Sequence, residues 1–286
     1  MSHLMNNYGR LPVSFDHGQG VWLWDKEGHK YLDALAGIAV NSVGHAHPRL
    51  VRAIADQASK LIHCSNYFNI DLQEQVAEKL VEHSGLEAVF FCNSGLEANE
   101  CAIKIARKFG HAKGIEVPNI IVLKHAFHGR SIATLSATGN PSVREDFSPY
   151  TEGFIFVDES DLDGIRKIVE ENKNVVAIFF EPILGEGGVV PVDLSVIKGI
   201  REICDEHDLL MMCDEVQCGM GRSGKWFAHQ WAEIKPDVIT MAKGLAGGVP
   251  VGAVVVSKKA NIFKPGNHGS TFGGNPLAMR AALETL

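Results

Sequence analysis

The residues with the clearest capacity for chemistry are a lysine and an aspartate, each of which directly follows an apolar run. Lys243 follows VITMA, and Asp214 follows LLMMC. A lysine that is desolvated at the end of a buried strand has a lowered pKa, and its neutral amine can attack an aldehyde. Most strand-end lysines instead extend their charged heads into solvent, so this signal alone is weak.

A predicted helix start after the run AVFFC offers a site for a phosphate group. Ser94 is followed three residues later by Glu97, which is the spacing of a capping box, and Gly95 lets a ligand approach the backbone closely. The unpaired N–H groups and the positive dipole end of a helix both favour an anion. Taken alone, such a start is more often an ordinary capped helix.

The segment HAFHGR, after another predicted strand, carries further candidates. Phe127 can belong to the core or stack on a flat ligand, and Arg130 can hold a carboxylate in its fork or lie in solvent. His125 and His128 are three residues apart, as metal ligands can be. No third ligand follows at a matching spacing, which argues against a metal site.

Two acids five residues apart, Glu181 and Glu186, stand in the glycine-rich segment EPILGEGG. They can form an acid–base pair, or they can anchor a strained loop. Their spacing does not separate the two interpretations.

The segment GMGRSGK, residues 219–225, imitates two nucleotide-binding motifs. A P-loop needs Ser or Thr after its lysine to meet magnesium, and Trp226 stands there instead. A dinucleotide fingerprint should directly follow a strand, whereas residues 214–217 intervene here. The mismatch with each motif therefore argues against nucleotide binding.

The combination of these residues is more specific than any one of them. Pyridoxal 5'-phosphate needs a helix start for its phosphate, a lysine for its aldehyde, flat apolar contacts for its ring and a carboxylate for its pyridine nitrogen. Ser94 with Gly95, Lys243, Phe127 and Asp214 meet these needs in turn. The sequence therefore predicts a pyridoxal phosphate site.

These residues require a scaffold in which strands and helices alternate. Apolar runs without polar alternation predict strands buried on both faces, which is typical of a mostly parallel sheet covered by helices. The predicted strands are 88–92, 119–123, 154–157, 175–180, 209–213, 238–241 and 253–256. The predicted helices are 48–62, 71–84, 95–109, 130–137, 161–172 and 194–207, with another beginning near 276. Ligands of such sheets bind beyond the carboxyl ends of the strands, where the candidates lie.

Composition excludes several classes of protein. The 286 residues are 45% apolar and 21% charged, which is typical of a folded globular protein. The net charge of -7 argues against nucleic-acid binding, and no apolar run approaches the roughly 18 residues that cross a bilayer. The N-terminus lacks the apolar core of a signal peptide. None of the six cysteines forms a C-x-x-C pair, so we expect reduced, mostly buried thiols and a cytoplasmic protein.

With these motifs in order, nearly the whole chain resembles the class III aminotransferases of pyridoxal-phosphate fold type I, most closely the acetylornithine type. The resemblance is carried by VWLWDKEGHKYLDALAGIAVNSVGHAHP, NSGLEANE, HAFHGRS, EPILGEGG, DEVQCGMGRSG and HGSTFGGNPLA. It implies an α/β/α large domain and transfer of the δ-amino group of N-acetylornithine to 2-oxoglutarate. The succinylornithine, ornithine and 4-aminobutyrate aminotransferases remain alternatives.

The resemblance also implies a role for each matching residue. Lys243 forms the Schiff base and moves the substrate proton, and Asp214 pairs with the pyridine nitrogen. The other implied cofactor contacts are Ser94, Gly95 and Leu96 at the phosphate, Phe127 and Val216 on the ring faces, and Gln217 at the ring oxygen. Arg130 and Glu186 are implied on the substrate side, where Glu186 pairs with a later arginine. Thr271 is implied to reach the phosphate of a neighbouring subunit in a homodimer.

The sequence departs from this family in two places. Leu96 replaces a threonine found in many members, which removes a hydroxyl contact to phosphate but leaves the backbone N–H. The chain also ends at Leu286, before the C-terminal small domain expected from the resemblance. We therefore expect residues 1–40 to contribute to a small domain and residues 41–286 to form the large one. A fragment that folds and binds the cofactor without full activity is a further alternative.

Overall fold

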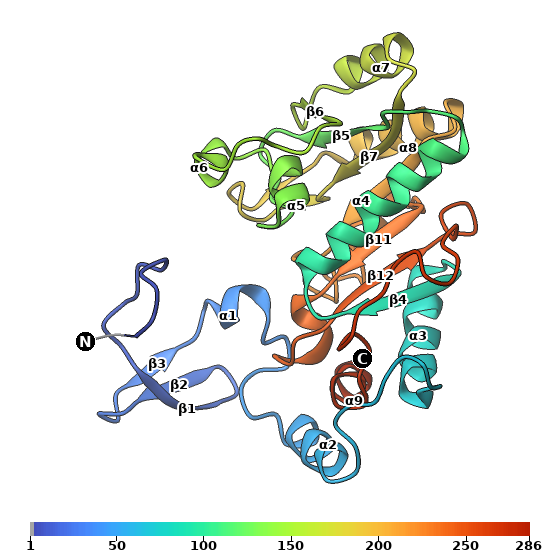
Figure 1. Ribbon diagram of the computed structural model, residues 1–286. Helices are drawn as coiled ribbons and strands as arrows, with labels where there is room; N and C mark the ends of the chain where they lie inside the picture. Colours follow the sequence, from blue (N-terminus) through green and yellow to red (C-terminus); the bar gives the residue numbers. More distant parts are fainter. Residues whose placement is uncertain (1–2) are drawn as a thin grey trace.

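A central sheet of seven strands forms the middle layer of the protein, which a computed structural model describes for residues 3–286 (Figure 1). Strand β12 is antiparallel to both of its neighbours, and the remaining pairs are parallel. In spatial order the strands are β4 (Ala88–Cys92), β12 (Gly252–Val256), β11 (Val238–Met241), β10 (Leu210–Asp214), β7 (Val175–Phe180), β5 (Asn119–Leu123) and β6 (Phe154–Val157). The predicted mostly parallel α/β sheet is confirmed.

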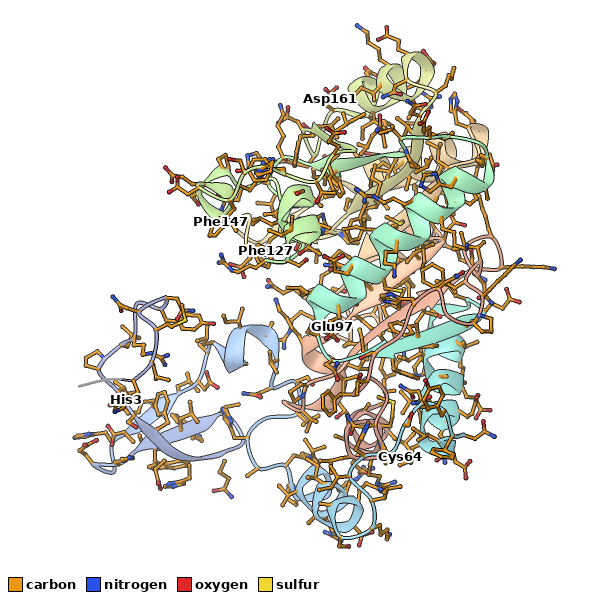
Figure 2. All side chains as sticks on the ribbon, viewed as in Figure 1. His3, Cys64, Glu97, Phe127, Phe147 and Asp161 are labelled. Atoms are coloured by element: carbon orange, nitrogen blue, oxygen red, sulfur yellow. The ribbon has the colours of Figure 1, made fainter. Side chains whose placement is uncertain are left out.

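Helices cover both faces of this sheet, and their side chains fill the space against it (Figure 2). Helix α4 (Gly95–Ala112) packs on one face. The other face is covered by α3 (Asp71–Ser84), α7 (Leu162–Glu171), α8 (Leu194–Glu206) and α9 (Pro276–Thr285). The shorter helices are α1 (Ala36–Ala39), α2 (Pro48–Ala58), α5 (Ile132–Ala137) and α6 (Pro141–Arg144), with 3-10 turns η1 (Ala228–Ala232) and η2 (Lys243–Ala246).

The buried strands contribute to both layers of the core. All six residues of β7 are buried, and so are all residues of β10, β11 and β12. Phe179 packs in the layer beneath α4, whereas Phe180 packs beneath α7 and α8. Because successive side chains point to opposite faces, a strand covered on both sides must be apolar throughout.

The predicted elements are all present, with small differences at their ends. Helix α2 ends at Ala58, although its apolar pattern predicted a helix to residue 62. The side chain of Gln57 donates to the carbonyl of Leu61, which closes a turn in place of further helix. Helix α4 extends three residues beyond the predicted end at Phe109.

A separate antiparallel sheet near the N-terminus was not predicted. It consists of β1 (Phe15–Gln19), β2 (Trp22–Asp25) and β3 (Lys30–Leu32), and it stands apart from the central sheet (Figure 1). A short pair, β8 (Ile183–Leu184) with β9 (Val190–Pro191), was also not predicted. Strands β1, β3 and β9 are largely exposed and lack the continuous apolar runs of the central sheet, and β2 and β8 are only four and two residues long.

The turn between β2 and β3 is organised by the buried carboxylate of Asp25. It accepts hydrogen bonds from the backbone N–H groups of Glu27 and His29 and from the hydroxyl of Tyr31. It also pairs with the Nδ1 of the His29 ring. Among residues 3–286, Asp25, Glu27 and His29 are the acidic and histidine cluster compact enough for a metal ion. These donors already surround Asp25, so the structure of the turn explains why the three residues lie close together.

The cysteines are free thiols, and all except the half-buried Cys64 are buried. This arrangement agrees with the expectation of reduced core cysteines. Within residues 3–286, no helix combines the length and the apolar character needed to cross a membrane.

Candidate active site

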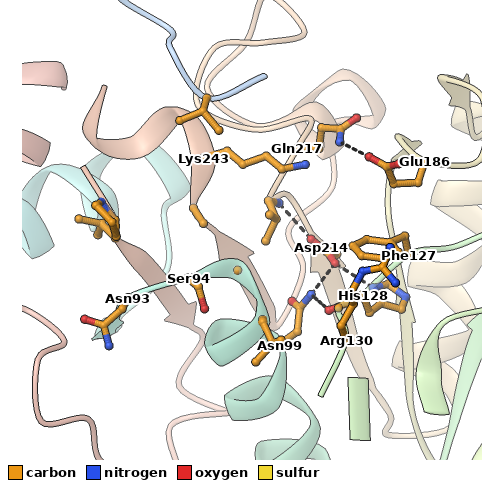
Figure 3. A pocket seen from close by; sticks show the side chains of 18 of the residues that line it. Asn93, Ser94, Asn99, Phe127, His128, Arg130, Glu186, Asp214, Gln217 and Lys243 are labelled. Atoms are coloured by element: carbon orange, nitrogen blue, oxygen red, sulfur yellow. Dashed lines mark hydrogen bonds and ion pairs between the residues drawn. The ribbon is translucent and has the colours of Figure 1, made fainter. Parts of the chain in front are cut away.

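A cavity of about 450 Å³ lies at the carboxyl ends of the central strands. Strands β4, β5, β7, β10 and β11 each lead into a segment that lines it, as is usual for ligand sites in open α/β sheets. Every predicted site residue except Thr271 lines this cavity: Ser94, Gly95, Leu96, Phe127, Arg130, Glu186, Asp214, Val216, Gln217 and Lys243. Figure 3 shows the side chains of Lys243, Asp214 and Phe127 around one space.

The start of α4 forms one wall of the cavity. Ser94 is the N-cap, and its hydroxyl accepts the N–H of Glu97 at 3.2 Å. The predicted capping box is only half formed, because the Glu97 carboxylate reaches the backbone and the side-chain amide of Asn93 instead of Ser94. Residues Gly95 and Leu96 occupy the first turn, where N–H groups have no partner within the helix and can bind an anion.

Gly95 is required here by close packing. A Cβ at this position would lie 2.6 Å from the Val216 side chain, which is closer than atoms pack. The glycine therefore lets the start of α4 lie directly against the segment that carries Val216.

Asp214 ends β10 on the floor of the cavity and is almost fully buried. One carboxylate oxygen accepts the Asn99 amide at 2.7 Å and pairs with the Nδ1 of His128 at 2.8 Å. The other oxygen accepts the N–H of Val216 at 3.0 Å. Three contacts, from α4, from the loop after β5 and from the segment directly after β10, thus fix the direction of this carboxylate, as Figure 3 shows for Asn99 and His128.

His128 and Asn99 were not predicted as site residues. His128 was considered only as a possible metal ligand with His125, and the structure separates the two rings. His125 is half exposed and pairs with Glu159, whereas His128 is buried and stacks on Phe179 with centroids 4.2 Å apart. For Asn99 the available signal was a polar residue among the apolar positions of a helix, since buried polar side chains need partners.

Lys243 follows β11 and enters the cavity from the side opposite Phe127 (Figure 3). Burial lowers the pKa of its ammonium group below the ordinary value, while the nearby charges of Asp214, Glu186 and Glu181 act in the opposite direction. Its φ of 37° lies in the left-handed region, which costs a non-glycine residue free energy. The structure thus holds a partly desolvated amine at a strained backbone position.

Phe127 and Arg130 lie together on the loop after β5. The guanidinium carbon of Arg130 is 5.7 Å from the centroid of the Phe127 ring. Arg130 is exposed at the opening of the cavity, so its fork is accessible to an incoming carboxylate.

The two acids of the segment EPILGEGG have different surroundings. Glu181 is buried, and its two oxygens accept the N–H groups of Phe127 and Gly185. Burial, followed by the negative charge of Asp214, raises the pKa of Glu181 to about 7. Glu186 lies at the rim, where it accepts a hydrogen bond from the Gln217 amide at 3.4 Å. These contacts favour the loop-anchor interpretation for Glu181.

Thr271 is the predicted site residue that the chain does not bring to this cavity. It is exposed and lines neighbouring hollows together with Ser270, His268 and Phe90. Within one chain, Thr271 therefore does not line the cavity that contains Ser94.

The segment that imitates nucleotide-binding motifs has no phosphate site of that kind. It leads into the short 3-10 turn η1 instead of an α-helix. The Lys225 amine donates to the carbonyl of Gln230 and lies 4.5 Å from the Trp231 ring centroid. Its geometry agrees with the rejection of both motifs.

The residues around the cavity fit pyridoxal phosphate. Free N–H groups at a helix start, a fixed buried carboxylate, a partly desolvated lysine and an aromatic side chain surround one space. Two buried polar atoms of the residues that contact Asp214, the Nε2 of His128 and the Oδ1 of Asn99, have no hydrogen-bond partner within residues 3–286 and remain available for a further polar contact at this site.

Comparison with known proteins identifies the family. The model of the family described as aminotransferase class-III matches residues 4–286. The acetylornithine aminotransferase of Nitrosomonas europaea is 56% identical over all of this chain and 73% of its own length. That of Aquifex aeolicus is 48% identical over 98% of this chain and 75% of its own.

Solved structures agree. The ornithine aminotransferase of Toxoplasma gondii superposes with a TM-score of 0.95 and 36% identity, covering 99% of this chain and 68% of its own. The N-acetylornithine aminotransferase of Stenotrophomonas maltophilia gives a TM-score of 0.81 and 39% identity, over 96% and 68% of the two chains. The chain therefore belongs to the class-III aminotransferase family.

Proposed function

We propose that this chain is a pyridoxal-phosphate-dependent aminotransferase that transfers the δ-amino group of N-acetylornithine to 2-oxoglutarate, a step of arginine biosynthesis. The products are N-acetylglutamate semialdehyde and glutamate. The observation that carries the reaction class is the placement of Lys243 and Asp214 at one cavity beside the start of α4. The substrate is supported by relatives named acetylornithine aminotransferase that are 46% to 56% identical over nearly the whole chain.

Most contacts to the cofactor would come from the chain whose cavity it occupies. We assign its phosphate to Ser94, Gly95 and Leu96, its ring faces to Phe127 and Val216, its ring nitrogen to Asp214 and its ring oxygen to Gln217. When bound, pyridoxal phosphate supplies an electrophilic aldehyde carbon and an electron-withdrawing ring.

Lys243 is the residue that moves the substrate proton. Because burial lowers its pKa, its neutral amine is available closer to neutral pH and can take a proton from the carbon that bears the amino group. Asp214 presents its negative charge to the ring nitrogen, which favours a protonated ring. Arg130 binds a substrate carboxylate, and Glu186 also lines the cavity.

The test is the variant Lys243→Ala. We expect it to lose the visible absorbance of the lysine-linked cofactor and to lower kcat by at least about 10²–10⁴-fold, the usual contribution of a general base. Lys225→Ala is the matched control, since this lysine contacts Gln230 and Trp231 away from the cavity. Turnover of N-acetylornithine by Lys243→Ala at the unmodified rate would exclude the mechanism.

Ornithine is a second candidate for the amino donor. It is favoured by the close superposition on the Toxoplasma gondii ornithine aminotransferase. Single-turnover rates of the holoenzyme with N-acetylornithine and with ornithine separate the candidates. We expect the acetylated donor to react faster, and the opposite order would assign the enzyme to ornithine.

We also propose a homodimer in which Thr271 reaches the phosphate of the neighbouring subunit. Its location away from its own chain's cavity supports this arrangement. We assign residues 1–40 to a small domain and 41–286 to the large domain, a division supported by the separate sheet of β1–β3. The buried free thiols and the biosynthetic role support a cytoplasmic location.

A further inference from the structure

Glu181 lies between two loops that form one wall of the cavity. It directly follows β7 near the middle of the central sheet, and only 4% of its surface is exposed. One of its oxygens accepts the N–H of Phe127 at 2.8 Å, and the other accepts the N–H of Gly185 at 3.2 Å. A single carboxyl group therefore contacts two segments that are distant in sequence.

Each of these segments carries a charged side chain to the opening of the cavity. Arg130 follows Phe127 by three residues, and Glu186 directly follows Gly185. Gly185 lies close to the Gln217 side chain, because a Cβ there would be 2.1 Å from its amide oxygen. A displacement of either loop would consequently change the distance between a cation and an anion at the rim.

The surroundings of Glu181 indicate why a carboxyl group is kept at this buried position. Burial and the charge of Asp214 both disfavour its ionised form. An apolar side chain would avoid that cost, but it would leave the partly buried N–H groups of Phe127 and Gly185 without their acceptors, which is unfavourable.

We propose that Glu181 is a positioning residue that fixes the Phe127–Arg130 loop and the Gly185–Glu186 turn relative to each other. It thereby sets the spacing of Arg130 and Glu186, on which recognition of a substrate with two separated charged groups depends. The substrate part of this inference rests on the proposed function. The coupling of the two loops is a property of the protein alone.

The test compares Glu181→Gln with Glu181→Met by amide hydrogen exchange of the full chain without substrate. Methionine has a similar volume and accepts neither N–H, so we expect faster exchange, by about tenfold, the effect of one lost hydrogen bond, in both segments, 125–130 and 183–188. Glutamine keeps one acceptor oxygen, so at least one segment should exchange faster. Asp237→Asn is the matched control, because this buried carboxylate accepts the N–H of Met211 at the opposite end of the sheet.

Unchanged exchange in either segment of Glu181→Met would overturn the proposal. If that variant does not fold, unchanged exchange of both segments in Glu181→Gln would do so. A kinetic measurement on the holoenzyme addresses substrate recognition, where Glu181→Gln should raise KM severalfold more than it lowers kcat. If amide exchange in both loops of Glu181→Met is faster but the unmodified protein transaminates no substrate, the coupling of the loops stands and the proposed function is rejected.

Discussion

At the scale of single residues, the site is defined by how its carboxylates are held. Asp214 receives contacts from Asn99 and His128, and Glu181 receives two backbone N–H groups. The charged candidates Asp214 and Lys243 were predictable, because each directly follows an apolar strand. The contacts that Asn99 and His128 make with Asp214 were not predictable, since both residues are far from Asp214 in the sequence and only the fold brings them together.

The contact between His128 and Asp214 leads to a stability prediction. Replacing His128 with Phe keeps a ring against Phe179 but removes one donor from a buried carboxylate, so the free energy of unfolding should fall by about 1–3 kcal/mol. Urea denaturation of the cofactor-free protein measures this loss. The control His125→Phe alters a half-exposed pair with Glu159 and should change stability by less than about 0.5 kcal/mol. Equal effects of the two variants would contradict the assignment.

The raised pKa of Glu181 leads to a prediction about pH. Its ordinary pKa of 4.5 rises to about 7 in the folded protein, where it faces Asp214, His128 and Lys243. A group with a raised folded pKa contributes stability that is present below pH 4.5 and is lost as pH rises through 7. In the Glu181→Gln variant, the side chain at position 181 cannot ionise. Between pH 5 and pH 8 it should therefore lose less stability than the unmodified protein, by an amount of the order of 3 kcal/mol. Parallel pH profiles from urea denaturation would refute the raised pKa.

At the scale of elements, the start of α4 depends on its contact with the segment after β10. Ser94 caps the helix, and Gly95 leaves space for Val216. The helix start was predictable from the cap spacing and the preceding apolar strand. The reason for the glycine was not predictable, because the close approach joins α4 to the segment after β10, which is distant in the sequence.

Replacing Gly95 with Ala tests this contact. A Cβ would lie 2.6 Å from Val216, so either the helix start or the Val216 wall must move. We expect a destabilisation of about 1–3 kcal/mol, typical of overpacking, together with weaker binding of pyridoxal phosphate. Thermal denaturation and cofactor titration measure the two effects. Gly9→Ala, which has open space around it, should change neither, and an equally mild effect of Gly95→Ala would show that the wall is adaptable.

Other parts of the fold also divide into elements that were predictable from the sequence and elements that were not. The strands of the central sheet were predictable because burial on both faces makes them continuously apolar, as in β7. The sheet of β1–β3 was missed because β1 and β3 are largely exposed and carry no such pattern, and β2 is only four residues long. The antiparallel direction of β12 was also not predictable, since an apolar strand has the same composition in either direction.

At the scale of the whole molecule, exposed apolar side chains gather beside Thr271. Tyr67 is 96% exposed and Phe272 is 62% exposed. Asn66 joins their two segments by donating to the carbonyls of Ser270 and Gly273. Large exposed apolar side chains in one area mark an interaction surface, and this one carries the residue assigned to a neighbouring cofactor.

The proposed exchange of Thr271 between subunits predicts complementation. A Thr271→Val homodimer should bind pyridoxal phosphate about tenfold more weakly, the effect of one hydrogen bond to a charged group, and a Lys243→Ala homodimer should be inactive. A heterodimer of the two variants contains one site with an intact lysine from one chain and an intact threonine from the other. We therefore expect that site to recover the cofactor affinity of the unmodified enzyme, measured as activity against pyridoxal phosphate concentration. If Thr271 served its own chain, the active site of the heterodimer would keep the weaker affinity, because its lysine and its altered threonine would belong to the same subunit.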